Sequence, residues 1–207
     1  MGLDMSIIRK RKQKFGKAKI FPFEKPFVRY YYKDGKSIDF DFPKNNHFVY
    51  KASKVKKSDY YEDTYELAYW RKFNALHKWF VDNVQDGNDD CGDYRLTKAK
   101  LEEILEILDD LADNIILKNG TVINGYIIKR SKIFKKYRQI PNKEKGKVIK
   151  NWKYCRDKLP TYNGTMFGSL DYNEYYYNNV VSARDRIREI LQGCDVDSEE
   201  IYYRSSW

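Results

Sequence analysis

The chain has 207 residues, of which 34% are charged and 16% aromatic. This composition excludes a disordered tail, and no stretch approaches the roughly 20 consecutive apolar residues that cross a membrane. The length suits one domain with its own core or two small ones, and we favour one cytoplasmic domain with no membrane partner.

The formal net charge of +10 is unevenly distributed. Residues 1–60 hold 16 Lys and Arg against 6 Asp and Glu, and residues 129–158 hold 13 against 2, whereas 61–128 and 159–207 are acidic. Two interpretations are open. The blocks attract each other within the fold, or the basic blocks form an electropositive surface for nucleic acid or a ribonucleoprotein. We favour the second.

The first 60 residues predict a small antiparallel sheet. Leu3–Ile8 forms its first strand, and the basic run 9–14 after it is expected to be a solvated loop. Segments 27–32 and 37–42 are rich in aromatic and branched residues, and an Asp-Gly pair between them predicts a hairpin. Residues 47–50 are expected to add a strand.

Residues 64–85 have the strongest helical pattern in the chain. At 100° per residue the apolar side chains share one arc, which holds Tyr69, Trp70, Phe73, Leu76, Phe80, Val81 and Val84. Three polar residues, Glu66, Asn74 and His77, fall within or beside that arc. Because burying an unpartnered polar group costs about 1–3 kcal/mol, these side chains either satisfy their neighbours or line a site.

His77 therefore has two interpretations. The first is a core histidine whose nitrogens are satisfied. The second is a general acid or base, with Asn74 holding its ring and Arg71 or Lys78 contacting a phosphate. Glu66 would lie three turns away on the same helix, roughly 16 Å along the axis, so it is a catalytic candidate but not the direct partner of His77.

The segment 86–93 resembles the start of a calcium loop, with Asp86, Asn88 and Asp90 at positions 1, 3 and 5. Thr97 stands at position 12, where such a loop needs Glu, so the calcium interpretation fails, and only weak divalent-ion binding stays open. The two histidines and three dispersed cysteines form no zinc pattern. We expect no metal site, no cofactor, and free thiols.

Two further long helices are predicted. Thr97 caps the first, whose apolar stripe comprises Leu101, Ile104, Leu105, Leu108, Leu111 and Ile115. Asp171 caps the last, with Glu174 at its third position and Gly193 at its end. The stripe of the last helix comprises Tyr172, Tyr176, Val180, Ala183, Ile187 and Ile190. Residues 195–207 are expected to form a polar tail.

The basic segment 129–158 predicts a helix around 133–138, a loop, and a helix around 147–156, after a strand or loop at 122–128. Its aromatic residues among lysines and arginines suit stacking on bases together with phosphate contact. We expect the nucleic-acid-binding residues in the two basic blocks: Arg9, Lys10, Arg11, Lys12, Lys129, Arg130, Lys132, Lys135, Lys136, Tyr137, Arg138, Lys150, Trp152 and Lys153.

These elements predict an α+β fold in which a small antiparallel N-terminal sheet packs against about three main helices. Residues 1–207 form one domain with four parts. They are a basic strand-rich part (1–60), an acidic helical part (61–128), a basic insertion (129–158), and a C-terminal helix with its tail (159–207).

Three short pieces of the chain carry a resemblance. They are Met1-Gly2-Leu3-Asp4-Met5, then Tyr69-Trp70-Arg71-Lys72 with Asn74, His77, Trp79 and Phe80, and last Phe167-Gly168-Ser169 with Asp171, Tyr172, Glu174 and Tyr176. In this order they resemble a widespread group of small proteins encoded by bacteriophages and prophages. The resemblance implies a phage accessory protein acting in the bacterial host, where such proteins often disarm host defence by occluding a nucleoprotein complex.

Two functional hypotheses follow. The first is an anti-CRISPR-like binder, not an enzyme, that inhibits a host nucleoprotein such as a CRISPR effector with its guide RNA. The alternative is an endoribonuclease that cleaves structured or guide RNA with His77 as general acid or base. Its second acid or base would come from Glu66, Glu174, Asp171 or a tyrosine. A structural protein of the virion is a third option.

Overall fold

The computed structural model describes residues 2–14, 25–33, 36–40, 60–130, 137–164 and 166–207. The predicted α+β class is confirmed. Six strands form one antiparallel sheet in the order β3-β2-β4-β1-β8-β5: β1 (Asp4–Lys14), β2 (Lys25–Lys33), β3 (Lys36–Phe40), β4 (Tyr60–Arg71), β5 (Asp93–Arg95) and β8 (Glu200–Ser206). The described residues also form four helices: α1 (Asn74–Asn83), α2 (Lys98–Asn114), α3 (Trp152–Lys158) and α4 (Glu174–Gly193).

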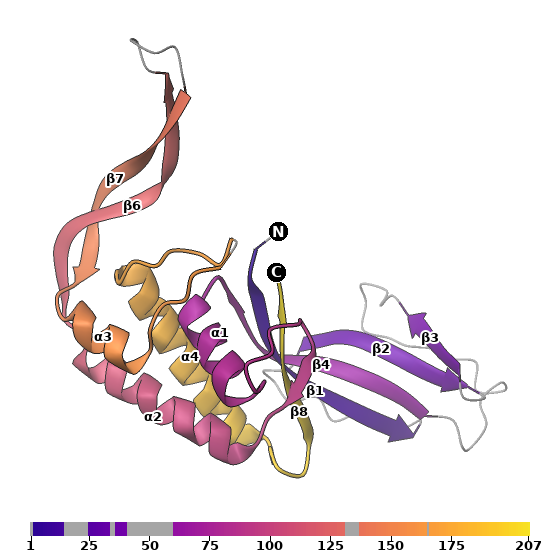
Figure 1. Ribbon diagram of the computed structural model, residues 1–207. Helices are drawn as coiled ribbons and strands as arrows, with labels where there is room; N and C mark the ends of the chain where they lie inside the picture. Colours follow the sequence, from indigo (N-terminus) through magenta and orange to yellow (C-terminus); the bar gives the residue numbers. More distant parts are fainter. Residues whose placement is uncertain (1, 15–24, 34–35, 41–59, 131–136, 165) are drawn as a thin grey trace.

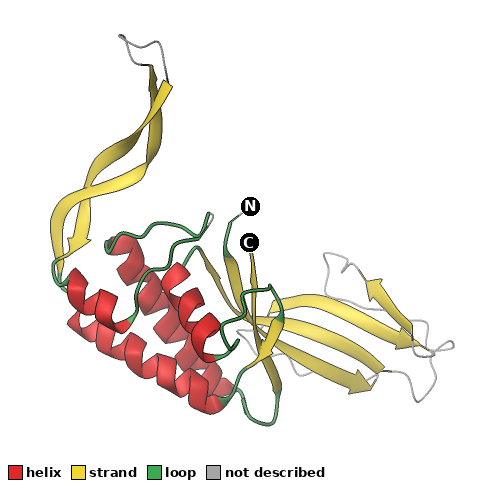
Figure 2. Cartoon of the chain, in the orientation of Figure 1, coloured by secondary structure: helices red, strands yellow, loops and turns green. Residues whose placement is uncertain are grey.

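Two further strands, β6 (Leu117–Arg130) and β7 (Tyr137–Ile149), form a separate antiparallel hairpin. In Figure 1 the helices lie together beside the sheet, while β2 and β3 extend away from them. The hairpin leaves the helical side and projects from the body of the molecule, and we call it the arm. Figure 2 shows the helices grouped between the base of the arm and the sheet.

The hydrophobic core lies between the helices and the inner parts of β1, β4 and β8. The predicted stripes of the second and last helices are confirmed. The core contains Leu101, Ile104, Leu108 and Leu111 of α2 and Tyr176, Val180, Ala183, Ile187 and Ile190 of α4. Thr97 caps α2 as predicted, because its hydroxyl accepts a hydrogen bond from the backbone N–H of Lys100. The cap of α4 is Asn173, not the predicted Asp171.

The helix predicted over 64–85 is wrong in its first half. Residues up to Arg71 belong to β4, and α1 begins only at Asn74. The cause is an irregularity in the pairing of β1 with β4, where Leu67 is an extra residue without a partner. Leu67 and Ala68 are consequently both buried, and this break in alternation imitates helical spacing.

Both ends of the chain are more regular than predicted. The run 9–14, expected as a loop, continues β1 to Lys14. Residues 200–206, expected in a polar tail, form β8, which pairs with β1 and brings the C-terminal segment into the sheet. The predicted hairpin is confirmed as the pairing of β2 with β3, with Lys33 opposite Lys36. The expected strand at 47–50 lies outside the described residues.

The secondary structure predicted for the basic insertion is also wrong. Tyr137 and Arg138, expected at the end of a helix, belong to β7, and residues 131–136 lie outside the described part. The second predicted helix is shorter, because residues up to Ile149 are strand and only α3 is helical. Of the two alternatives for 122–128, the strand is observed.

Candidate functional site

The arm concentrates positive charge away from the body. Residues 117–149 contain ten Lys and Arg and a single acidic residue, Glu144. Lys129 on β6 lies directly opposite Arg138 on β7. Like charges in that position destabilise a strand pair, so folding alone gains nothing from this arrangement. A polyanion bound along the arm would relieve the repulsion.

A bulge in the middle of the arm decides which side chains of β6 share a face with those of β7. Asn124 and Gly125 of β6 together oppose the single residue Asn142 of β7, between the pairs Ile123–Lys143 and Tyr126–Pro141. Gly125 has φ of +72°, a conformation that glycine adopts without strain. The extra residue places Tyr126 on the same face as Lys143, whereas regular pairing would turn it to the other face.

Glu144 fixes this bulge. One of its carboxylate oxygens accepts a hydrogen bond from the Asn124 amide (3.0 Å) and the other accepts one from the Asn142 amide (2.9 Å). The only acidic side chain of the arm is therefore engaged in the geometry of the hairpin.

The root of the arm is anchored to α2 and α4. The Asn151 side chain accepts a hydrogen bond from the N–H of Ile116 (2.9 Å) and donates one to the carbonyl of Asn114 (2.9 Å), so it ties both strands to the end of α2. Ile149 is buried, and its N–H donates to the carbonyl of Tyr172 just before α4. The arm consequently starts from a fixed point of the core.

A row of lysines follows one face of β7 from this root. Lys143, Lys145 and Lys147 alternate along the strand, which places them on one face about 7 Å apart. Lys147 pairs with Glu174 at the root (3.1 Å), whereas Lys143 and Lys145 have no carboxylate within ion-pair distance in the described part of the chain. Sequence reasoning missed these lysines as binding residues, although the alternation Lys-x-Lys-x-Lys is visible in the sequence.

Beyond the root, α3 carries an exposed indole ring. Trp152 stacks on Tyr172 with ring centroids 6.4 Å apart, and the cations of Lys153 and Arg156 lie 5.9 and 5.4 Å from its ring. Lys150 is exposed in the turn between β7 and α3. Three of the predicted binding residues, Lys150, Trp152 and Lys153, thus lie at the base of the arm.

Four more predicted residues, Lys129, Arg130, Tyr137 and Arg138, lie on the arm itself, in its outer part. Lys132, Lys135 and Lys136 fall outside the described residues. Lys12 lies on β1 opposite Glu62 of β4. The structure therefore places seven of the ten predicted residues of the second basic block on the arm or at its base.

Three residues of the first basic block, Arg9, Lys10 and Arg11, are instead used inside the fold. Arg9 is fully buried and forms an ion pair with Glu199 (3.2 Å), so the prediction that it contacts nucleic acid is wrong. Arg11 binds the same carboxylate (3.3 Å), and Lys10 lies 2.8 Å from Asp93. Burial disfavours the Asp93 carboxylate, but hydrogen bonds from Arg204 and Lys10 outweigh it and lower the pKa of Asp93. For these residues the internal-pairing interpretation of the charge blocks holds.

His77 is a buried residue with two partners. Its Nδ1 lies 2.7 Å from the Tyr203 hydroxyl, and its Nε2 lies 3.1 Å from a carboxylate oxygen of Asp89. Because a carboxylate only accepts, Nε2–H donates to Asp89 and Nδ1 accepts from Tyr203. Burial lowers the pKa of His77 and outweighs the opposing effect of Asp89. This geometry matches the interpretation of His77 as a core histidine with satisfied nitrogens.

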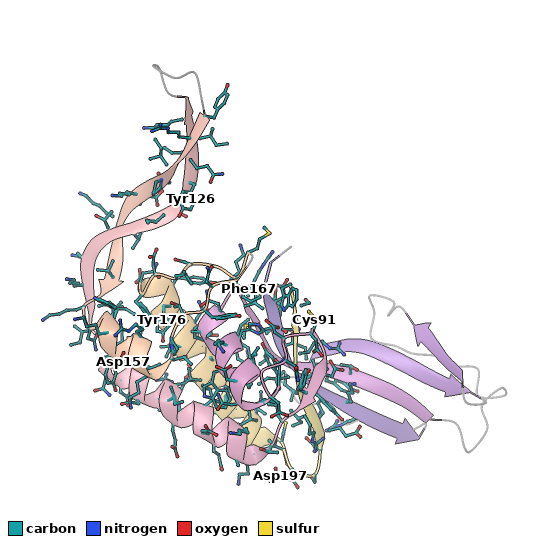
Figure 3. All side chains as sticks on the ribbon, viewed as in Figure 1. Cys91, Tyr126, Asp157, Phe167, Tyr176 and Asp197 are labelled. Atoms are coloured by element: carbon teal, nitrogen blue, oxygen red, sulfur yellow. The ribbon has the colours of Figure 1, made fainter. Side chains whose placement is uncertain are left out.

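Asn74 does not hold the His77 ring, contrary to the prediction. Its amide donates to the carbonyls of Phe167 (3.3 Å) and Ser169 (3.0 Å), and its oxygen accepts from the N–H of Tyr162 (3.1 Å). Asn74 therefore fastens the loop before α4 onto the start of α1. Figure 3 shows Phe167 of this loop close to the body, and its ring lies edge-on to His77 with centroids 5.3 Å apart.

The remaining catalytic candidates lie on β4, not on the helix of His77. Glu66 accepts a hydrogen bond from the Ser6 hydroxyl (3.2 Å), and Arg71 is exposed at the end of the strand, 3.6 Å from Asp4. Glu66, Arg71, Asn74 and His77 therefore each have polar partners of their own, and these contacts have no partner in common.

The acidic segment 86–93 is engaged internally. Asp89 accepts a hydrogen bond from the Trp207 indole (2.9 Å) in addition to that from His77, and Asp90 accepts from the Tyr94 hydroxyl (2.9 Å). Among the residues that the structure describes, no group of three or more His, Cys, Asp or Glu side chains is placed to hold a metal ion. The three cysteines are free thiols, as predicted.

No helix in the described ranges is long and apolar enough to span a membrane. Comparisons of the chain with protein-family models, with curated proteins and with solved structures find no match.

Proposed function

We propose that this protein binds nucleic acid through the arm and the adjoining helix α3. The observation that carries the proposal is the charge of the two described strands of the arm, seven basic residues against one acidic residue, on a hairpin that projects from the body. The one carboxylate, Glu144, is held by two asparagines at the bulge. A two-stranded ribbon of this kind is narrow enough to enter the major groove of a duplex, and its lysines reach phosphates along either a duplex or a single strand.

The contrast with the first basic block supports this choice of surface. Arg9, Lys10 and Arg11 have carboxylate partners within the fold, whereas Lys143 and Lys145 lack one in the described part of the chain. Positive charge without internal partners attracts a polyanion, and the counterions that binding releases make the affinity depend on salt.

The resemblance to phage-encoded proteins suggests the setting of this binding. The proposal therefore extends to a phage accessory protein that inhibits a host defence nucleoprotein, in the manner of an anti-CRISPR protein, by covering its nucleic acid. The arm would contact the nucleic acid, and the body would sterically block the host nucleoprotein.

The test is the affinity for fluorescently labelled structured RNA and duplex DNA between 50 and 200 mM salt, measured by anisotropy. We expect log affinity to fall linearly with log salt, by about 0.9 per neutralised phosphate on a duplex. The double variant Lys143→Gln/Lys145→Gln should lower this slope by about 2 and weaken binding to both nucleic acids. A matched control is Lys98→Gln/Lys100→Gln on α2, because those ammonium groups already pair with Glu102 and Glu103.

Absence of binding, or an affinity that does not change with salt, would contradict the proposal. In a second assay the protein is incubated with structured RNA, either free or in a CRISPR effector complex, and the RNA is then separated on a denaturing gel. Intact RNA is expected. Discrete cleavage that disappears in His77→Ala, in a variant that is still folded by circular dichroism, would instead support the endoribonuclease.

A further inference from the structure

The outer part of the arm presents two tyrosine rings and an isoleucine on one face. Tyr126 and Ile128 of β6 are 64% and 68% exposed, and Tyr137 of β7 is 72% exposed. Figure 3 shows Tyr126 on the arm, well away from the helices. The opposite face carries the pair Ile127 and Ile140, which lie directly opposite each other and are only 40% and 38% exposed. The most exposed large apolar groups are therefore gathered on one side.

This face continues into the row of lysines. Along β7, residues 137, 139, 141, 143 and 145 share one side of the strand, and the bulge at Asn124–Gly125 brings Tyr126 and Ile128 to that same side. From Lys145 to Tyr137 the face is about 26 Å long at the usual rise of a strand. It has cations towards the body and aromatic rings towards the tip.

Lysines followed by aromatic rings match the phosphates and the bases of a single-stranded nucleic acid. Proteins that bind single strands combine a positively charged track for the backbone with aromatic side chains on which successive bases stack, over roughly 4–16 nucleotides. In a duplex the faces of the bases are covered by their neighbours, so exposed tyrosine rings have nothing to stack on. The adjoining lysines also favour a polyanion over an apolar protein surface as the partner of these rings.

We propose that this face of the arm binds single-stranded nucleic acid, with Lys143 and Lys145 on the phosphates and Tyr126 and Tyr137 stacked on unpaired bases. The inference rests on the proposed function and narrows it to one class of ligand. RNA and DNA share this chemistry.

The experiment compares labelled 16-nucleotide single strands, oligo(dT) and oligo(rU), with a 16-base-pair duplex at one salt concentration. We expect at least tenfold tighter binding of a single strand. Tyr126→Leu and Tyr137→Leu should each weaken that binding by about tenfold and leave the duplex unaffected, while the matched Tyr→Phe variants keep it, since phenylalanine retains the stacking face. Ile127→Ala, on the opposite face of the arm, is the control and should bind as the unaltered protein does.

The two single strands distinguish the source of the ligand, because tighter binding of oligo(rU) than of oligo(dT) assigns the face to RNA and the reverse assigns it to DNA. Equal affinity for duplex and single strand, with no effect of the leucine variants, would overturn this inference and leave the proposed function standing. Failure of every oligonucleotide to bind would overturn both.

Discussion

Arg9 and Glu199 lie 190 positions apart in the chain, and in the fold Nη1 of Arg9 is 3.2 Å from a carboxylate oxygen of Glu199. Arg9 has no exposed surface, and burial lowers its pKa while the charge of Glu199 acts in the opposite direction. Glu199 is a quarter exposed at the side chain, and it also binds Arg11. The loop before β8 thus supplies the charge that makes a buried arginine acceptable within the central sheet.

Loss of this carboxylate should destabilise the fold. Glu199→Gln removes the negative charge but keeps the size of the side chain, so the buried Arg9 guanidinium loses the carboxylate that lies 3.2 Å away. We expect a loss of roughly 3 kcal/mol in the free energy of unfolding, the lower end of the range for a broken buried ion pair, because Glu199 is partly exposed. Urea denaturation measures it. Glu200→Gln, an exposed neighbour, is the control, and equal stability of the two variants would contradict the expectation.

His77 should make the stability of the protein depend on pH. Its pKa in the fold is lowered from the unfolded value of about 6.5. At a pH between the folded and unfolded pKa values, the unfolded chain therefore binds more protons than the folded one. Stability conferred by the neutral ring is therefore complete above about pH 7.5 and falls as the pH is lowered through 6.5. His77→Gln should flatten the curve of unfolding free energy between pH 7.5 and 5.5. A curve that keeps its full slope in His77→Gln would contradict the assignment.

Gly168 should be intolerant of a side chain. Its φ is +106°, and a Cβ atom there would lie 2.8 Å from the carbonyl oxygen of Lys72. Gly168→Ala combines a strained backbone with a clash against backbone, so we expect a loss of about 2–3 kcal/mol in thermal or urea unfolding. Gly87 shares a positive φ of +81° but has no atom within 4 Å of the added Cβ. Gly87→Ala should therefore cost about 1 kcal/mol, and a larger loss there than at Gly168 would disprove the role of the clash.

The three thiols should differ in reactivity. Cys91 is exposed, whereas Cys155 is buried and burial raises the pKa of its thiol to about 11. Burial also raises the pKa of Cys194, which is partly exposed. Because the thiolate is the reactive form, iodoacetamide at pH 8 should label Cys91 first and Cys155 only after denaturation. Mass spectrometry of peptides at timed intervals checks the order, and early labelling of Cys155 in the folded protein would be inconsistent with its burial.

The sequence predicts the parts of this fold that follow one period without interruption. The stripes of α2 and α4 are regular, and both helices were predicted with their apolar faces. The second half of β4 was predicted as helix because the unpaired Leu67 breaks the alternation of buried and exposed residues. The spacing of its buried residues is therefore compatible with a helix as well as with a strand. In β8, Ile201, Tyr203 and Ser205 are buried in strict alternation, but Arg204 and Ser205 give the segment a polar composition typical of a tail.

The candidate sites depend on partners that are distant in the chain. The pairing of Lys10 with Asp93, or of His77 with Tyr203, has no local signal, because the sheet that joins them is assembled from both ends of the sequence. The positive charge of the insertion was visible in the composition. Its form as an arm was not, since Pro141 and Gly146 within the segment indicated a loop between helices, whereas the β7 strand contains both.

The position of β8 between β1 and β5 also bears on how the protein folds as it is made. Asp4 pairs with Ser206, so β1 leaves the ribosome long before the strand that lies beside it in the sheet. Ribosomes add about 5–20 residues per second, which leaves Met5 and Ile7 without that neighbour for on the order of ten seconds or more. Sheets that join such distant segments also fold slowly. We therefore expect the central sheet to close only after synthesis of β8, and until then the edge of β1 that faces away from β4 has no partner strand.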